Sequence, residues 1–217
     1  MTTTTDVTDP ELATAIAELA RLDPVMAHLV VTTGPCRLRD RRGVRTNFAA
    51  LCESVVYQQL AGRAARAIFG RFLEAVDGEI TSESVLRHPE AVLRAAGLSA
   101  AKARCIRALA ERAASGELAL EAVDDLADDE VVSTVSAVPG IGRWTAEMFL
   151  IFQLGRLDVW PVGDYGVRKG YARAYELPEV PSPKELAAFG ERFRPYRSVA
   201  AWYCWRAAET VTPGRQP

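Results

Sequence analysis

The chain has 217 residues, of which 49% are hydrophobic and 25% charged, the balance of a folded soluble protein. No apolar run is long enough to span a membrane, and the first residues, MTTTTDVTD, lack the basic start and apolar core of a signal peptide. A cytoplasmic protein is therefore expected. The formal net charge of −2 argues against a protein that coats nucleic acid indiscriminately.

Signals for helix starts recur along the chain, whereas strand signals are nearly absent. Proline stands where a first helical residue is expected in Asp9-Pro10, Asp23-Pro24, His88-Pro89 and Ser182-Pro183. Apolar residues recur at helical spacing at Leu12, Ile16, Leu19 and Leu22. The sequence predicts an all-α fold of roughly ten helices joined by mostly short loops.

Charge is unevenly distributed along the chain. Residues 37–45, RLRDRRGVR, contain five arginines, whereas residues 117–130 contain seven acidic residues and no basic one. Such segregation is typical of a protein with one DNA-facing side, although an arginine run is also often a solvated loop. The threonine-rich residues 1–8 are expected to be disordered.

Residues 46–76 are predicted to form one or two helices, with Thr46 as the N-cap. Within them, Tyr57-Gln58-Gln59-Leu60 places two consecutive amides where an amphipathic helix ends near Gly62. Packing alone does not call for two glutamines there, so they are candidates for a specific contact. A merely polar helix end is the alternative.

The four cysteines are spread along the chain and form no CxxC pair. Neither a zinc site nor a disulfide framework is therefore predicted, and four reduced, buried thiols are expected. They are Cys36, Cys52, Cys105 and Cys204.

A tight turn followed at once by a helix is predicted at VPGIGRW, residues 138–144. Gly140 and Gly142 permit backbone conformations and close approaches that a Cβ forbids. The first amide groups of the following helix, predicted from Arg143 to Leu154, lack intrahelical partners and carry the positive end of the helix dipole. They form an anion site suited to a phosphate, although an ordinary interhelical turn would have the same pattern.

One acidic residue follows this helix after a short loop. Gly155 ends the helix, the loop Asp158-Val159-Trp160-Pro161 breaks the chain, and Asp164 opens the next helix. The commonest role of Asp at such a place is that of an N-cap. Asp164 lies one helix and one loop after the anion site, at a predicted helix start.

Aromatic residues and arginines concentrate in a predicted terminal helix, whose sequence from Pro195 is PYRSVAAWYCWR. Such a helix can simply close the core, and this is the interpretation favoured for Trp202.

Taken together, the hairpin, the Pro-containing loop with its Asp, the QQL run and the PYRS helix resemble the helix-hairpin-helix DNA glycosylases. Within them, the sequence is similar to the 3-methyladenine DNA glycosylase II (alkylpurine) branch, from about residue 23 onward. The resemblance implies one compact two-lobed domain at 9–217. One lobe would hold residues from about 48 to 155, the other about 9–47 and 156–217, with the active site in the cleft between them.

The resemblance also implies roles for individual residues. Asp164 would be the catalytic residue. The base pocket would be formed by Trp144, Trp205 and Tyr57, and the wedge that fills the gap left by a flipped base by Gln59, with Gln58 and Leu60 beside it. Phosphate contacts would come from Gly140, Gly142, Arg143, Thr145 and Lys169. A monovalent cation, Na⁺ or K⁺, would bind backbone carbonyls of Ser136, Val138 and Ile141.

The activity implied is removal of alkylated purines from double-stranded DNA by a monomeric enzyme, without a required cofactor. Trp144 stands where strand-cutting relatives have a catalytic lysine, so cleavage of the base alone is expected. The chain lacks the four-cysteine array of the iron-sulfur branches. Gly163 stands where many alkylpurine enzymes have a second Asp, which alters the local charge. A glycosylase for deaminated or oxidised bases and a non-catalytic DNA-binding module are the alternatives.

Overall fold

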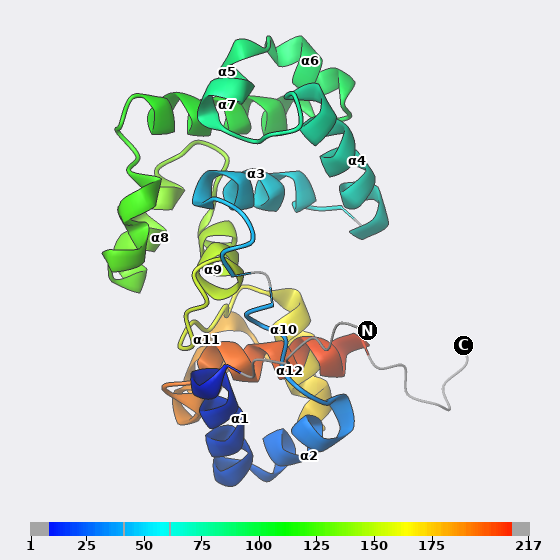
Figure 1. Cartoon of the computed structure of the whole chain (residues 1–217). Coiled ribbons are helices and arrows are strands. Elements are labelled where there is room, and N and C mark those ends of the chain that lie inside the picture. Colours follow the sequence, from blue (N-terminus) through cyan, green and yellow to red (C-terminus); the bar gives the residue numbers. More distant parts are fainter. Residues whose placement is uncertain (1–8, 41, 61, 210–217) are drawn as a thin grey trace, which may run out of the picture. The chain divides into compact units, whose positions relative to one another are not determined.

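The computed structural model describes residues 9–40, 42–60 and 62–209, and these residues form helices and loops with no strand among them (Figure 1). The all-α prediction is confirmed. The described residues contain twelve α-helices and two 3-10 helices, somewhat more than expected. The chain divides into two compact units, one of residues 41–155 and one of the residues up to Asp40 together with those from Arg156 onward. We call them the inner unit and the outer unit, because in the sequence the first lies between the two segments of the second. The predicted N-terminal disorder of residues 1–8 falls outside the described residues.

The outer unit consists of helices from both ends of the chain. They are α1 (Pro10–Leu22), α2 (Pro24–Thr33), α10 (Tyr165–Ala174), α11 (Pro183–Gly190), the 3-10 helix η2 (Glu191–Phe193) and α12 (Arg197–Glu209). Helix α12 packs against α10, α2 and α1 (Figure 1). The predicted caps Asp9, Asp23 and Ser182 each accept backbone amides through their side chains, with Pro in the first turn.

Helices α10 and α12 cross in backbone contact. A Cβ added to Gly170 of α10 would lie 1.8 Å from the carbonyl oxygen of Cys204 in α12. No side chain fits in such a space, so the glycine is what lets the two helices meet.

The loop that leads into α10 is tied to the start of α12. The Val159 amide donates to Ser198 Oγ at 2.9 Å, and the Ser198 amide donates to the carbonyl of Leu157 at 2.9 Å. Arg197 Nε donates to Asp158 Oδ1 at 2.7 Å. The loop is therefore held at several points just before Asp164.

The inner unit is contiguous in sequence. Its helices are α3 (Asn47–Tyr57), α4 (Gly62–Ala75), α5 (Ser82–Arg87), α6 (Glu90–Ala95), α7 (Ala100–Ala114), the 3-10 helix η1 (Leu120–Asp125), α8 (Asp128–Ser136) and α9 (Arg143–Phe152). Helix α7 packs against α3, α5 and α6, and α9 packs against α3 and α8 (Figure 1). Thr46 caps α3 as predicted.

Three local predictions differ from the structure. Helix α9 ends at Phe152 rather than Leu154, because the Leu154 amide donates to the carbonyl of Phe149, five residues back, as the chain turns toward Gly155. Pro89 is the N-cap of α6 rather than its first residue. Leu22, at the end of its apolar stripe, is 51% exposed.

The arginine run of residues 37–45 is only partly available to an outside partner. Arg39 pairs with Asp9 and Glu11, each at 2.8 Å, and Arg45 pairs with Glu53 at 2.5 Å. These two arginines therefore form ion pairs within their own units. One arginine of the run, at position 41, lies outside the described residues.

Candidate functional site

Asp164 is the N-cap of α10, and its carboxylate is held by two donors. Its Oδ1 accepts the backbone amide of Val167 at 2.8 Å and the indole N–H of Trp205 at 2.9 Å. Both side chains are half-buried. Hydrogen bonds to a carboxylate stabilise its charged form and set its orientation. The N-cap and catalytic interpretations of Asp164 are thus compatible, because capping leaves the carboxylate fixed at the start of the helix.

Gly166, which belongs to none of the sequence motifs, makes this pairing possible. A Cβ at Gly166 would lie 2.9 Å from Trp205 Cδ1 and 3.0 Å from Asp164 Oδ1. A larger residue would therefore push the indole away from the carboxylate. The only signal in the sequence is a glycine within a helical pattern, which usually has a packing or functional reason.

The predicted hairpin is present between α8 and α9. The Ile141 amide donates to the carbonyl of Val138 at 3.0 Å, and Gly140 has a φ of +95°. A Cβ at Gly140 would lie 2.9 Å from Cys105 Sγ, whereas a Cβ at Gly142 would have no atom within 4 Å. Gly142 is the N-cap of α9 and is exposed, so the first-turn amides begin at an open surface.

The side chains at the start of α9 differ in their surroundings. Trp144 is 40% exposed. The Arg143 side chain is also exposed, and its Nε donates to Oε1 of the buried Glu147 at 2.9 Å. Thr145 is only 2% exposed, and its hydroxyl accepts a hydrogen bond from Gln58. This burial argues against the predicted phosphate contact of Thr145.

The two glutamines after α3 have different environments. Gln58 Nε2 donates to the carbonyl of Gly140 at 3.2 Å and to Thr145 Oγ1 at 3.1 Å, so it joins the end of α3 to the hairpin. The Gln58 side chain therefore contacts protein, while Gln58 remains the neighbour of the predicted wedge Gln59. Gln59 is exposed and has a φ of +54°, and Leu60 is 39% exposed.

The remaining predicted residues are placed as follows. The Tyr57 ring packs edge-on against the buried Phe69, with ring centroids 6.4 Å apart, so much of it belongs to the core of the inner unit. Lys169 is exposed on α10. Asp164 and Trp205 also belong to the outer unit, whereas the hairpin and the glutamine turn belong to the inner unit. The structure thus joins Asp164 to Trp205, and Gln58 to the hairpin, each within one unit.

The turn after α8 offers oxygen atoms suited to a small cation. The Val138 carbonyl accepts one hydrogen bond, from Ile141, and has a second lone pair. Ser136 Oγ is buried and has no hydrogen-bond partner in the described part of the chain. Carbonyl and hydroxyl oxygens are the ligands that hard cations prefer. Among the described residues, no cluster of three or more His, Cys, Asp or Glu side chains could hold a metal ion.

The four cysteines are free and buried, as predicted. Burial raises the pKa of Cys36 to about 12 and that of Cys105 to about 11. Neutral thiols are poor nucleophiles. In the described residues, no helix has the length and apolar character that crossing a membrane requires.

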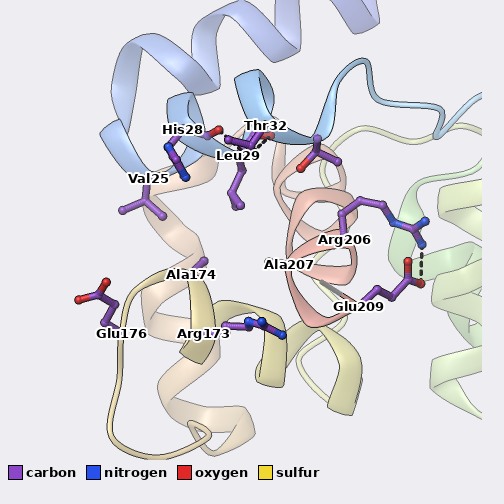
Figure 2. Close-up of a pocket in the computed structure, with 11 residues that line it drawn as sticks. Val25, His28, Leu29, Thr32, Arg173, Ala174, Glu176, Arg206, Ala207 and Glu209 are labelled. Carbon is purple, nitrogen blue, oxygen red and sulfur yellow. Dashed lines mark hydrogen bonds and ion pairs between the residues drawn. The ribbon is translucent and has the colours of Figure 1, made fainter. Parts of the chain in front are cut away.

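The outer unit also contains an open cavity of about 660 Å³ among α2, α10 and α12. Figure 2 shows His28 and Thr32 of α2, Arg173 of α10, and the Arg206–Glu209 pair of α12 around it. None of the residues predicted for the site is among the described residues that line it. The cavity is therefore not the setting of the Asp164 carboxylate.

Residues 52–195 match the family described as the HhH-GPD superfamily base excision DNA repair protein. The chain belongs to this superfamily. The matched region contains the QQL turn, the hairpin and Asp164, and it ends just before the PYRS helix. The HhH-GPD match thus spans three of the elements from which the resemblance was inferred, and it stops at Pro195, the first residue of the PYRS segment.

Individual HhH-GPD relatives align over nearly the whole chain. DNA-3-methyladenine glycosylase 1 of Schizosaccharomyces pombe is 33% identical over 201 residues, which cover 91% of this chain and 88% of that protein. A solved structure of the S. pombe 3-methyladenine DNA glycosylase with abasic DNA has a TM-score of 0.82 at 34% identity, covering 89% of this chain and 95% of that one. The DNA-3-methyladenine glycosidase of Bacillus halodurans has a TM-score of 0.77 at 36% identity, covering 93% and 90%.

Proposed function

We propose that the protein is a DNA glycosylase that hydrolyses the N-glycosidic bond of alkylated purines, of the 3-methyladenine and 7-methylguanine class. The observation that carries the proposal is the Asp164 carboxylate, oriented at the start of α10 by the Val167 amide and the Trp205 indole. A carboxylate fixed in this way stabilises the positive charge that develops on the sugar as the bond to the base breaks. The names of the relatives support the alkylpurine class.

The chemistry follows from the charge of the substrate. Alkylation at N3 or N7 makes the purine cationic, so the base leaves readily and needs little acid catalysis. The electron pair of the C1′–N bond goes to the departing base, which becomes neutral. Water adds its oxygen to C1′ and passes a proton to Asp164, from which it reaches solvent. An electron-poor base is also attracted to aromatic faces, a role proposed for Trp144 and Trp205.

The target nucleotide must leave the helix before this reaction, because the sugar-base bond cannot be reached inside the base stack. In our proposal, Gln59 fills the vacated position and Leu60 packs beside it. The exposed amides around Gly140 and Gly142 bind the DNA backbone on the 3′ side of the lesion. A monovalent cation at the carbonyls of Ser136, Val138 and Ile141 would strengthen this phosphate contact.

We propose further that the enzyme leaves the DNA strand intact. A glycosylase that also cuts the strand uses an amine that attacks C1′ of the sugar, and the Trp144 side chain has no amine. Lys169 is five residues past Asp164, so it points about 140° away around the axis of α10. Borohydride treatment of the enzyme with lesion DNA provides the measurement, because only an imine is reduced to a stable cross-link. We expect no cross-link, and one that disappears in Lys169→Ala would make Lys169 the nucleophile.

Release of free base from methylated duplex DNA tests the proposed function directly. We expect the wild-type protein to release 3-methyladenine and 7-methylguanine. Asp164→Asn keeps the shape and one hydrogen-bond acceptor but loses the charge, and we expect a loss of about 10³-fold or more in single-turnover rate with DNA binding retained. Release of only deaminated or oxidised bases would assign a different substrate, and no release of any base would leave a DNA-binding module.

The proposal includes a monomeric enzyme acting in the cytoplasm, where it would associate with the nucleoid. Size-exclusion chromatography with light scattering, with and without a short lesion duplex, measures the number of chains in each species. A single chain per duplex is expected.

A further inference from the structure

A lysine from another helix holds the backbone around the exposed Gln59. The amino group of Lys102, on α7, donates to the carbonyl of Val56 at 2.8 Å and to the carbonyl of Gln58 at 2.7 Å. These carbonyls belong to the last turn of α3 and the residue that follows it. A cation at this end of a helix satisfies carbonyls that lack intrahelical partners and opposes the negative end of the dipole.

The turn that Lys102 holds has an unfavourable backbone conformation. Gln59 has a φ of +54°, a region that residues other than glycine seldom adopt. The turn is closed by the Leu60 amide, which donates to the Tyr57 carbonyl at 3.3 Å. Such a conformation persists only where the surroundings determine it, and it is often found at functional sites.

Two contacts from different elements determine this turn. Lys102 binds the main-chain carbonyl of Gln58, while the Gln58 side chain donates to Gly140 and Thr145 of the hairpin region. Gln58 is thereby held at both ends, and Gln59 is the next residue. The side chain of Gln59 is left exposed while its backbone direction is fixed.

The position of Lys102 is itself well defined. Ser99 caps α7 and accepts the Lys102 amide at 3.3 Å, so the lysine is in the first turn of its helix. Its side chain is half-buried, and this burial lowers its pKa. A partly desolvated cation with two carbonyl partners is not typical of a lysine that only solubilises a surface.

We propose that Lys102 is a positioning residue for base extrusion: by holding the carbonyls of Val56 and Gln58, it keeps Gln59 directed toward the space that a flipped base vacates. The inference rests on the proposed role of Gln59 and thus on the proposed function. Lys102 does not touch the reacting atoms in this account. It acts only through the conformation of the turn.

Lys102→Met tests the proposal, because methionine fills similar space without the donors. On a duplex with a paired, methylated base, we expect the single-turnover excision rate to fall about tenfold, the effect of losing hydrogen bonds from a charged donor. On the same lesion in a mismatch, which is already partly extruded, the fall should be less than threefold. Affinity for undamaged duplex should stay within twofold of wild type.

Two matched variants complete the experiment. Lys102→Arg keeps the charge and the donors and should recover most of the rate on the paired lesion. Arg104→Met removes a positive charge from an exposed position on the same helix. We expect this variant to change the excision rate by the same factor on paired and mismatched lesions. Equal falls on paired and mismatched lesions in Lys102→Met, or an unchanged rate on both, would overturn the proposal and leave Lys102 as a cap of α3.

A reporter base beside the lesion separates this proposal from the proposed function. Its fluorescence measures extrusion even if no base is released. A wild-type protein that raises the signal without excision would refute the proposed activity but not the positioning role. An extrusion signal as strong in Lys102→Met as in wild type would refute the positioning role, whatever the outcome for excision.

Discussion

The indole N–H of Trp205 and the backbone amide of Val167 donate to the same oxygen of Asp164. One donor comes from the helix that Asp164 caps and the other from α12, so the carboxylate is oriented by two elements. Such an arrangement is in place before a substrate binds and does not need to form during the reaction.

Removing the indole donor should slow base excision without removing the aromatic ring. For Trp205→Phe we expect a loss of about 10- to 100-fold in single-turnover rate, the effect of a hydrogen bond to a charged group. Trp202→Phe is the matched control, since Trp202 is on the same helix and packs edge-on against Tyr203 at 5.1 Å. A rate near wild type for Trp205→Phe would show that the indole donor is not needed to orient Asp164.

A methyl group at Gly166 should separate Trp205 from Asp164. Alanine normally stabilises a helix relative to glycine by about 1 kcal/mol, so a loss of activity in Gly166→Ala would arise from the contact with the indole and not from helix propensity. We expect at least a tenfold slower excision in a folded protein. Gly163→Ala, whose Cβ meets no atom within 4 Å, should fold equally well and stay within about threefold of the wild-type rate. Equal rates for the two variants would contradict the steric argument.

The two glycines of the hairpin should differ in their effect on stability. Gly140 has a positive φ and no room for a Cβ beside Cys105, so Gly140→Ala should lower the free energy of unfolding by about 2–4 kcal/mol. Gly142 has a φ of −93° and open space around it, so Gly142→Ala should change that free energy by less than about 0.5 kcal/mol. Urea unfolding measures both. Similar values for the two variants would mean that the hairpin yields readily at Cys105.

The ion pair between Arg39 and Asp9 should make the free energy of unfolding decrease as the pH becomes acidic. The hydrogen bond from Arg39 lowers the pKa of Asp9 below its ordinary value, with smaller contributions from the amides it caps. A carboxylate with a lowered folded-state pKa stabilises the fold above its unfolded pKa, about 4, and the gain is lost as pH falls through the folded pKa.

Asp9→Asn isolates this charge, because asparagine is also a good N-cap. At pH 7 the wild type should be more stable than the variant by about 0.5–1 kcal/mol, allowing for the partial exposure of the pair. As pH falls through the lowered folded-state pKa of Asp9, the difference should shrink toward zero. A difference in unfolding free energy that is constant with pH would show that capping geometry, not charge, accounts for it.

Local features of this fold were predictable from sequence. The caps Asp9, Asp23, Ser99 and Ser182 act on amides two or three residues away, so their chemistry is visible in a short window. The N-cap position of Asp164 was visible for the same reason, and the hairpin followed from two glycines before a helix.

Contacts between distant residues were not predictable in this way. Gln58 meets Gly140 across 82 positions and Trp205 meets Asp164 across 41, and nothing in either local window specifies a partner. Gln58 was therefore grouped with Gln59 although it bonds to protein. The contacts of Lys102 and Gly166 were not predicted, because they depend on residues that only the fold brings near them.

The order in which the units occur along the chain has a consequence for synthesis. The inner unit is one uninterrupted stretch that ends at Gly155, so all of its helices have been synthesised before α10 is translated. Helices α1 and α2 are made first, yet their partner α12 is made last, so the outer unit cannot close until the chain is nearly finished. Since domains generally fold as units during translation, a ribosome stalled well beyond residue 155 should present a protease-resistant inner unit and a still unprotected α1 and α2.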